Sequence, residues 1–228
     1  MEELRWIRIL YCYPEEITDE LIDAMKRLPK VCHYLDIPIQ HGVDTILKKM
    51  GRRTDRAQLT RMVGKLRTEI PDIALRTTLI TGFPGETEED FEEMKEFVRQ
   101  MRFERLGVFT YSQEEDTPAA EMEDQIPEEI KEERRDIIMA MQQEIAFENN
   151  ESRIGEEMDV MIEGYLPDDD IYVGRSYMDA PDVDGFVFLS TSWHLETGDY
   201  VRARIVQAQG YDLIGEVIEE EDEDELTK

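Results

Sequence analysis

The chain has 228 residues, a formal net charge of −29 and 8% aromatic residues, so it can form one large domain or a medium one plus a small one, each with a buried core. No run approaches the roughly 20 apolar residues that a membrane helix needs, and the first residues lack the pattern of a signal peptide, so we expect a cytoplasmic protein with no membrane partner. A charge this negative also opposes non-specific binding of nucleic acid.

The first 154 residues alternate between strand and helix patterns. Apolar runs rich in β-branched residues predict strands, and stretches with helical periodicity lie between them. This alternation predicts an α/β fold with a parallel sheet, and the nearly continuous apolar character of the strands predicts helices on both faces. The expected strands cover residues 6–13, 34–39, 75–83 and 106–111, and the expected helices cover residues 19–28, 43–50, 56–69 and 88–101.

A long amphipathic helix is predicted from Pro127 to about residue 153, where the pattern changes. Short alternating runs then follow, separated by Gly, Pro and Asp, and they predict a small antiparallel, OB-like barrel of about five strands. The last residues are acidic and predict a disordered tail. The expected domains are 1–154, 155–219 and the tail 220–228, and the expected barrel strands are 158–162, 171–177, 186–189, 200–207 and 213–218.

The ligand-binding groups of a parallel sheet gather at the C-terminal ends of its strands. In this chain those ends are Tyr13-Pro14, Gln40-His41, the turn TGFPGET at 81–87 and Tyr111-Ser112. The glycines of TGFPGET permit close backbone approach, so one interpretation is a turn that holds a flat or anionic ligand at a helix N-terminus. The alternative is a plain strand-to-helix turn, because the P-loop lysine and the three-glycine dinucleotide pattern are both missing.

Four polar residues near these ends are candidate ligand groups. Gln40 can donate and accept hydrogen bonds, and His41 titrates near neutrality, although a satisfied turn amide and a loop-capping histidine are the alternatives. Arg76 and Thr78 share one face of their strand. An arginine inside a barrel-like sheet needs an anion, which is either a carboxylate ligand or a core acid such as Asp36.

The sequence contains no serine elbow, close cysteine pair or metal-ligand cluster. Cys12 and Cys32 lie 20 positions apart in apolar segments, which is typical of reduced, buried thiols. We therefore expect the strand ends to hold a cofactor that carries out the chemistry, and we expect no catalytic and no metal-binding residue in this chain.

Three motifs, taken in order along the chain, closely resemble the radical S-adenosylmethionine (SAM) methylthiotransferases from their third core strand onward. The motifs are YLDIPIQH with ILKKMGRR, LRTTLITGFPGETEEDF, and YSQEEDTPA. The resemblance implies roughly half to two-thirds of a radical SAM TIM-like barrel. The stretch GRSYMDAPDVDGFVFL also resembles the TRAM domain of that family. The resemblance further implies N-terminal strands and domains that hold two [4Fe-4S] clusters in the full-length parent. Their cysteine ligands are absent here, so we expect this chain alone to be catalytically inert.

The Gln-His pair after Pro38 resembles one branch of this family. Enzymes of that branch add a methylthio group to the β-carbon of an aspartate in the small-subunit ribosomal protein of the decoding centre. One alternative is the tRNA-modifying branch, which typically shows Gln-Ser-Gly at this place. The other is a non-catalytic acidic module that binds a basic protein.

The charge distribution favours a protein substrate. Residues 155–228 contain 21 acidic and four basic residues, whereas residues 41–76 contain nine basic and four acidic ones. A TRAM-like barrel that gripped RNA should carry a basic face, so we expect no RNA partner here and expect instead a basic ribosomal protein. The basic run 48–53 is then expected to meet another partner, either the missing half of the enzyme or the substrate assembly.

The resemblance also implies which residues line the SAM site. We expect Gln40, His41, Arg76, Thr78, Ile80 and Gly82 to face that cofactor. In the TRAM-like unit, Asp179, Asp182 and Asp184 are expected either to face the substrate or to shape an Asp-Pro turn, with the turn favoured for Asp182.

Overall fold

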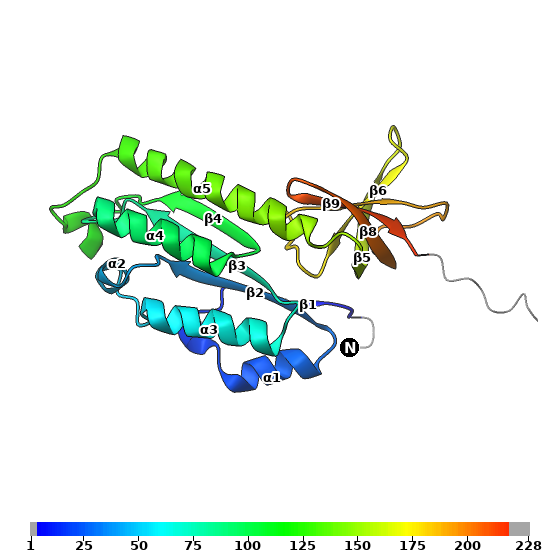
Figure 1. Ribbon diagram of the computed structural model, residues 1–228, viewed down its shortest axis with the longest axis horizontal. Coiled ribbons are helices and arrows are strands. Elements are labelled where there is room, and N and C mark those ends of the chain that lie inside the picture. Colours follow the sequence, from blue (N-terminus) through cyan, green and yellow to red (C-terminus); the bar gives the residue numbers. More distant parts are fainter. Residues whose placement is uncertain (1–3, 219–228) are drawn as a thin grey trace, which may run out of the picture. The chain divides into compact units, whose positions relative to one another are not determined.

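The computed structural model describes residues 4–218, which form two compact units divided between Ala146 and Phe147. In the described part of the first unit, four parallel strands form one sheet in sequence order, with helical crossovers between them (Figure 1). The predicted α/β fold with a parallel sheet is confirmed. The elements are β1 (Ile7–Ile9), η1 (Pro14–Glu16), α1 (Asp19–Arg27), β2 (Val31–Gln40), α2 (Asp44–Lys49), α3 (Arg56–Glu69), β3 (Ala74–Thr81), α4 (Glu88–Met101), β4 (Arg105–Thr110), η2 (Pro118–Glu121) and α5 (Glu128–Glu151).

Side-chain caps fix where α3 and α4 begin. Asp55 accepts a hydrogen bond from the backbone N–H of Gln58, and Thr87 accepts one from the backbone N–H of Asp90; in both helices the third residue bonds back to the cap. These reciprocal contacts satisfy N–H groups that have no partner inside the helix. Both helices consequently begin at the predicted residues, and their ends also match the predicted ranges.

The helices cover one face of the sheet. Leu35 and Ile37 on β2, Leu75 and Leu79 on β3 and Val108 on β4 form one core with residues of α1, α3, α4 and α5. The prediction of helices on both faces is therefore wrong. Along β3, side chains alternate between buried and half-buried, as expected for a strand whose second face lines an open concavity.

The first strand is shorter than predicted. Only Ile7–Ile9 of the expected 6–13 forms β1. Tyr11 has φ of 55°, in the left-handed region, and this interrupts the extended backbone before Pro14 begins a 3₁₀ turn. The chain still follows β2 beyond this break, because the N–H of Cys12 donates to the carbonyl of Asp36.

Within residues 155–218, five strands close into a barrel. The predicted OB-like barrel is confirmed, but the purely antiparallel arrangement is wrong, because β7 and β9 are parallel neighbours. They run in the same direction because each lies an even number of antiparallel pairings from β5: β7 through β6, and β9 through β8. The predicted acidic tail lies outside the described residues. The strands are β5 (Glu157–Leu166), β6 (Ile171–Ser176), β7 (Val187–Ser190), β8 (Tyr200–Gln209) and β9 (Asp212–Val217).

Candidate functional site at the strand ends

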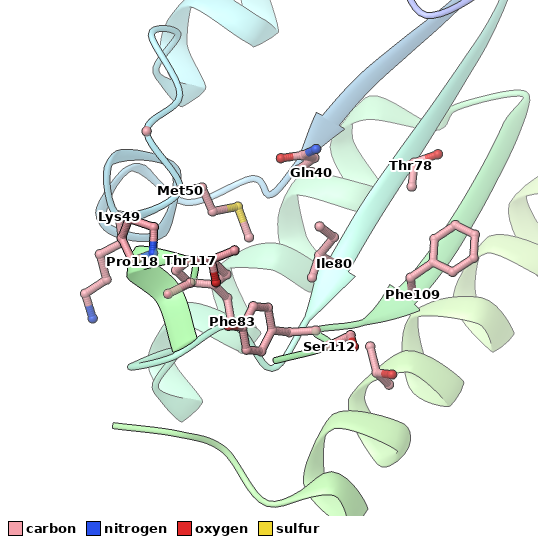
Figure 2. A pocket seen from close by; sticks show the side chains of 14 residues that line it. Gln40, Lys49, Met50, Thr78, Ile80, Phe83, Phe109, Ser112, Thr117 and Pro118 are labelled. Carbon is pink, nitrogen blue, oxygen red and sulfur yellow. The ribbon is translucent and has the colours of Figure 1, made fainter. Parts of the chain in front are cut away.

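A pocket of about 610 Å³ lies at the C-terminal ends of β2, β3 and β4. Figure 2 shows Gln40, Thr78 and Ile80 along neighbouring strands, with Met50 and Pro118 from the segments around them. A concave, largely apolar pocket with a few polar groups at strand ends is the usual form of a cofactor site. We call it the strand-end pocket; its lining is Gln40, Lys49, Met50, Gly51, Thr78, Ile80, Phe83, Phe109, Thr110, Tyr111, Ser112, Thr117, Pro118 and Ala119.

Strand register explains which side chains reach the strand-end pocket. Ile80 pairs with Phe109, and Thr78 pairs with Gly107, so these four positions share the face away from the helices. Phe109 remains 63% exposed there. Of the six residues expected to bind SAM, the structure brings Gln40, Thr78 and Ile80 together at the pocket.

Gln40 is held at the pocket by a residue of the basic run. Its φ of 73° lies in the left-handed region, where the chain leaves β2. The guanidinium of Arg52 donates from Nε to the side-chain oxygen of Gln40 at 3.0 Å, and from Nη2 to the carbonyl of Pro38 at 2.6 Å. Arg52 also lies over the ring of Tyr13, with 5.3 Å from Cζ to the centroid. Burial lowers the pKa of this guanidinium, while Tyr13 and Glu15 act in the opposite direction.

His41 does not line the strand-end pocket but is fully buried beside it. Its Nδ1 accepts from the N–H of Val43, the residue before α2, at 3.1 Å. Since Nδ1 is thereby an acceptor, Nε2 carries the proton and donates to Glu86 at 3.2 Å. The geometry agrees with the loop-capping interpretation of His41.

Glu86 is the centre of this buried network. Besides His41, its carboxylate accepts from the backbone N–H of Gly82 at 3.0 Å and from Nη1 of Arg134 on α5 at 2.7 Å. Its side chain is 0% exposed, and that of Arg134 is 8% exposed. A buried carboxylate with three donors, one of them charged, fixes the turn at 82–86 against α5.

The turn TGFPGET is therefore satisfied from within the protein. Gly82 has φ of 71°, and an added Cβ would lie 2.2 Å from Cγ of Lys131. Its N–H is bonded to Glu86, and Gly82 itself is not among the pocket-lining residues. The carboxylate of Glu86 already accepts the hydrogen bond of the Gly82 N–H, so the geometry agrees with a plain strand-to-helix turn whose Phe83 borders the pocket.

Arg76 lies one pleat below the pocket lining and contacts Asp36 across the β2–β3 pair, with 3.4 Å from Nη1 to Oδ1. The carboxylate is 4% exposed and the guanidinium 19% exposed. This is the structural ion pair that the sequence left as an alternative, and Arg76 does not line the strand-end pocket.

The sequence placed Tyr111 at a strand end without giving it a role, and sequence reasoning missed Lys131. Tyr111 packs edge-on against Phe83, with 5.2 Å between ring centroids, and its buried hydroxyl has no hydrogen-bond partner in the part of the chain that the structure describes. Nζ of Lys131 donates to the carbonyl of Tyr111 at 2.9 Å. A Tyr at a strand end was visible in the sequence, but no pattern there linked it to a lysine twenty residues later.

The three acids expected to face the substrate form turns in the barrel unit. Asp179 is 2% exposed and accepts from the hydroxyl of Ser176 at 2.7 Å. Asp184 accepts from the N–H of Ala180 at 2.8 Å. Asp182 is exposed with φ of 61°. Two of these carboxylates are thus engaged inside the turn, which agrees with the turn interpretation.

The cysteines are both free thiols, with Cys32 buried and Cys12 half-buried. Burial, with a smaller contribution from Glu16, raises the pKa of the Cys12 thiol.

Among residues 4–218 no three His, Cys, Asp or Glu side chains are grouped to hold a metal ion. Within the same residues, no helix is long and apolar enough to span a membrane.

Family comparisons agree with this architecture. Residues 2–98 match the radical SAM superfamily, and residues 154–218 match the TRAM domain. The fold is similar to that of coproporphyrinogen III oxidase (HemN) from Escherichia coli, a radical SAM enzyme, with a TM-score of 0.52 at 22% identity over 61% of this chain and 32% of that one. Residues 2–98 are thus similar to a radical SAM segment, and residues 154–218 are similar to a TRAM domain.

Two curated relatives are similar along nearly the whole chain. The "Ribosomal protein uS12 methylthiotransferase RimO" of Lachnoclostridium phytofermentans is 61% identical over 94% of this chain, and that of Desulfitobacterium hafniense is 53% identical over 96%. These matches confirm the resemblance to the radical SAM methylthiotransferases of the RimO type. The chain spans 49% of the length of each of these relatives.

Proposed function

We propose that this chain is part of a radical SAM methylthiotransferase that modifies ribosomal protein uS12. The observation that carries the proposal is the 61% identity over 215 residues, which runs through both units to a relative of that name. In this proposal the first unit helps to hold SAM, and the TRAM unit helps to hold the protein substrate.

The volume of about 610 Å³ and the lining of the strand-end pocket support SAM as its ligand. Ile80, Met50 and Phe83 offer an apolar slot for a flat base, and Thr78 offers a hydroxyl for a polar group. Gln40 has its oxygen bonded to Arg52, so its amide N–H₂ is left to donate towards the pocket. When bound, SAM would supply the methyl group and the radical; these residues would bind and orient it.

An iron–sulfur cluster does not fit the described residues. Cluster ligation needs several cysteine thiolates close together, whereas Cys12 and Cys32 lie on different elements and burial raises the pKa of Cys12. Any cluster would require ligands from outside residues 4–218, and we expect this chain alone to be inert. The proposed full-length methylthiotransferase would hold two [4Fe-4S] clusters through those other residues.

The barrel charge supports a protein rather than tRNA as the substrate. Residues 155–218 contain fourteen acidic residues and three arginines. Each arginine is bound to an acid: Arg175 to Glu163 at 2.5 Å, Arg202 to Asp159 at 3.2 Å and Arg204 to Glu157 at 2.7 Å. Phosphate binding needs an excess of positive charge, whereas a basic ribosomal protein complements an acidic surface.

The finer features of the reaction are further proposals that rest on the family resemblance. The modified atom would be the β-carbon of an aspartate in the decoding-centre protein of the small subunit, and the reaction would take place in the cytoplasm, where ribosomes are assembled.

Deleting the gene that encodes this chain and weighing uS12 by mass spectrometry tests the proposed function. We expect uS12 from the deletion strain to lack the mass of one methylthio group, and fragment spectra to place that group on an aspartate in the wild type. An unchanged uS12 mass, or loss of a methylthio group from tRNA instead, would contradict the proposal.

A further inference from the structure

The basic run after β2 belongs to a longer basic segment whose exposed cations have no role in the proposed function. Residues 41–65 contain seven basic and two acidic residues, a net charge of +5, whereas the whole chain carries −29. Each of the two acids accepts from a backbone N–H group: Asp44 from that of Arg56 at 2.7 Å, and Asp55 from that of Gln58 at 2.7 Å. Both acids therefore stabilise the start of α3, and the segment keeps its positive charge.

Three exposed cations in this segment have no acidic partner in the part of the chain that the structure describes. They are Lys48 near the end of α2, Arg53 in the connecting loop and Arg61 on α3. By contrast, Arg56 is paired with Glu93 at 3.6 Å. An exposed cation without an ion pair can bind an anionic partner without first giving up another one. We call Lys48, Arg53 and Arg61 the basic patch.

The basic patch comes from one compact part of the first unit, beside the strand-end pocket. Residues 50–55 connect α2 to α3, and the hydrogen bond between Asp44 and Arg56 holds the starts of the two helices together (Figure 1). Lys49, the sequence neighbour of the patch, lines the pocket, and its Nζ donates to the carbonyl of Gly85 at 3.2 Å (Figure 2). A partner on the basic patch would therefore lie next to the candidate cofactor site.

The chemistry of the basic patch suits phosphates. A nucleic-acid backbone presents closely spaced phosphates, and their neutralisation by Lys and Arg releases condensed counterions, which supplies much of the affinity. Arg53 and Arg61 can each bond a phosphate through two N–H groups. The Debye length at physiological salt is about 8 Å, so the patch attracts phosphates locally although the whole chain is negative.

We propose that the basic patch binds phosphates of ribosomal RNA beside uS12, so that the enzyme acts on uS12 within the small ribosomal subunit. This inference rests on the proposed function, in which the substrate is a ribosomal protein and is therefore a neighbour of ribosomal RNA. An acidic protein surface is the other class of partner, but a phosphate backbone offers the higher density of negative charge. RNA is therefore the partner that the basic patch fits best.

Binding of the chain to purified small ribosomal subunits, measured over a range of salt concentrations, tests the basic patch. We expect the double variant Arg53→Gln, Arg61→Gln to weaken binding at least about fivefold at low salt. It should also lower the slope of log Kd against log salt concentration by about 2, one for each lost phosphate contact. The matched control is Arg99→Gln, Arg135→Gln, which removes two ion-paired arginines from α4 and α5 and should leave affinity within about twofold.

Acetylation of lysines in the wild-type chain needs no substitution and so does not depend on how the variants fold. We expect small ribosomal subunits to protect Lys48 from the reagent. Lys26 on α1, whose side chain is 40% exposed, should react as fast as it does in the free chain.

Failure to bind small subunits, equal salt slopes for wild type and the double variant, or unprotected Lys48 would overturn the inference. Tighter binding of tRNA, or binding of free uS12 that depends equally on Arg53 and Arg61, would assign the basic patch to another partner and overturn it as well. The proposed function is decided separately, by the mass of uS12 in the deletion strain. A missing methylthio group there, together with an unaffected double variant, would remove this inference alone.

Discussion

The guanidinium of Arg52 lies 3.0 Å from the side-chain oxygen of Gln40, so the basic run after β2 contacts the strand-end pocket. The same arginine bonds the carbonyl of Pro38 and lies over Tyr13. It therefore holds together the end of β2, the chain before η1 and the segment after α2. At least one member of the basic run has its partner inside the first unit, and its role is to orient Gln40.

Replacing Arg52 tests this role. Lysine keeps the charge but cannot contact Gln40 and Pro38 with a planar fork, so we expect Arg52→Lys to lower the free energy of unfolding by about 1.5–3 kcal/mol. Arg53→Lys is the matched control, because Arg53 is the exposed neighbour, and it should change stability by less than about 0.5 kcal/mol. Denaturant unfolding measures both; equal effects would contradict the role of Arg52.

The Glu86 network predicts a larger effect. Glu86→Gln leaves the buried guanidinium of Arg134 without its closest carboxylate, and we expect a loss of about 3–5 kcal/mol. Glu88 also contacts Arg134, at 3.1 Å, but its side chain is 73% exposed, so Glu88→Gln should cost less than about 1 kcal/mol. If the two variants unfolded at the same denaturant concentration, Glu86 would not be the centre of this network.

Alanine substitutions at two glycines with nearly the same φ distinguish the cost of backbone strain from the cost of side-chain crowding. Gly82 and Gly51 have φ of 71° and 72°, but an added Cβ meets Lys131 at Gly82 and nothing within 4 Å at Gly51. Gly51→Ala should therefore cost only the left-handed conformation, about 1–2 kcal/mol, and Gly82→Ala about 1–3 kcal/mol more. Thermal unfolding of both variants measures the difference, and equal costs would show that Lys131 moves aside freely.

Asp90 at the start of α4 predicts a pH dependence. Burial of its carboxylate acts to raise the pKa, but hydrogen bonds from the N–H and hydroxyl of Thr87 and from the hydroxyl of Thr45 outweigh burial and lower the pKa below its ordinary 3.8. A carboxyl with a lowered pKa in the folded state stabilises that state above the unfolded pKa, and this contribution is lost as pH falls through the folded pKa.

We therefore expect Asp90→Asn to destabilise the protein by about 1 kcal/mol at pH 7, the usual cost of a weakened helix cap, and to have less effect once the pH is below 3.8. Unfolding of wild type and variant across this pH range measures the difference. A difference that grew in acid would have the wrong sign for a lowered pKa.

The sequence predicted the elements well where the evidence was local. Helices α3 and α4 match the predicted ranges because Asp55 and Thr87 mark their starts within four residues of sequence. The end of β1 was mispredicted because a left-handed Tyr11 has no sequence signal comparable to a glycine. The parallel β7–β9 pair was missed for another reason, since strand order depends on how the barrel closes and not on any single strand.

The candidate site was predicted in part. Thr78 was placed on one face with Arg76 by strand alternation, and Ile80 was expected from the family resemblance; Thr78 and Ile80 line the pocket, whereas Arg76 does not. His41 is buried because Glu86, 45 residues later, reaches it, and pairings over such separations leave no pattern in one sequence. For the same reason the sequence did not predict that Phe109 lines the pocket, since its place beside Ile80 depends on the register of β3 and β4.

The most direct test of the account is a methyl NMR titration of the chain with SAM. Methyl resonances detect weak binding at single residues, and Ile80 and Met50 line the strand-end pocket while Ile214 lies in the barrel unit. We predict that the methyl signals of Ile80 and Met50 shift progressively as SAM is added and that those of Ile214 stay in place. Unchanged signals from Ile80 and Met50 at saturating SAM, or shifts confined to Ile214, would contradict the assignment of this pocket to the cofactor.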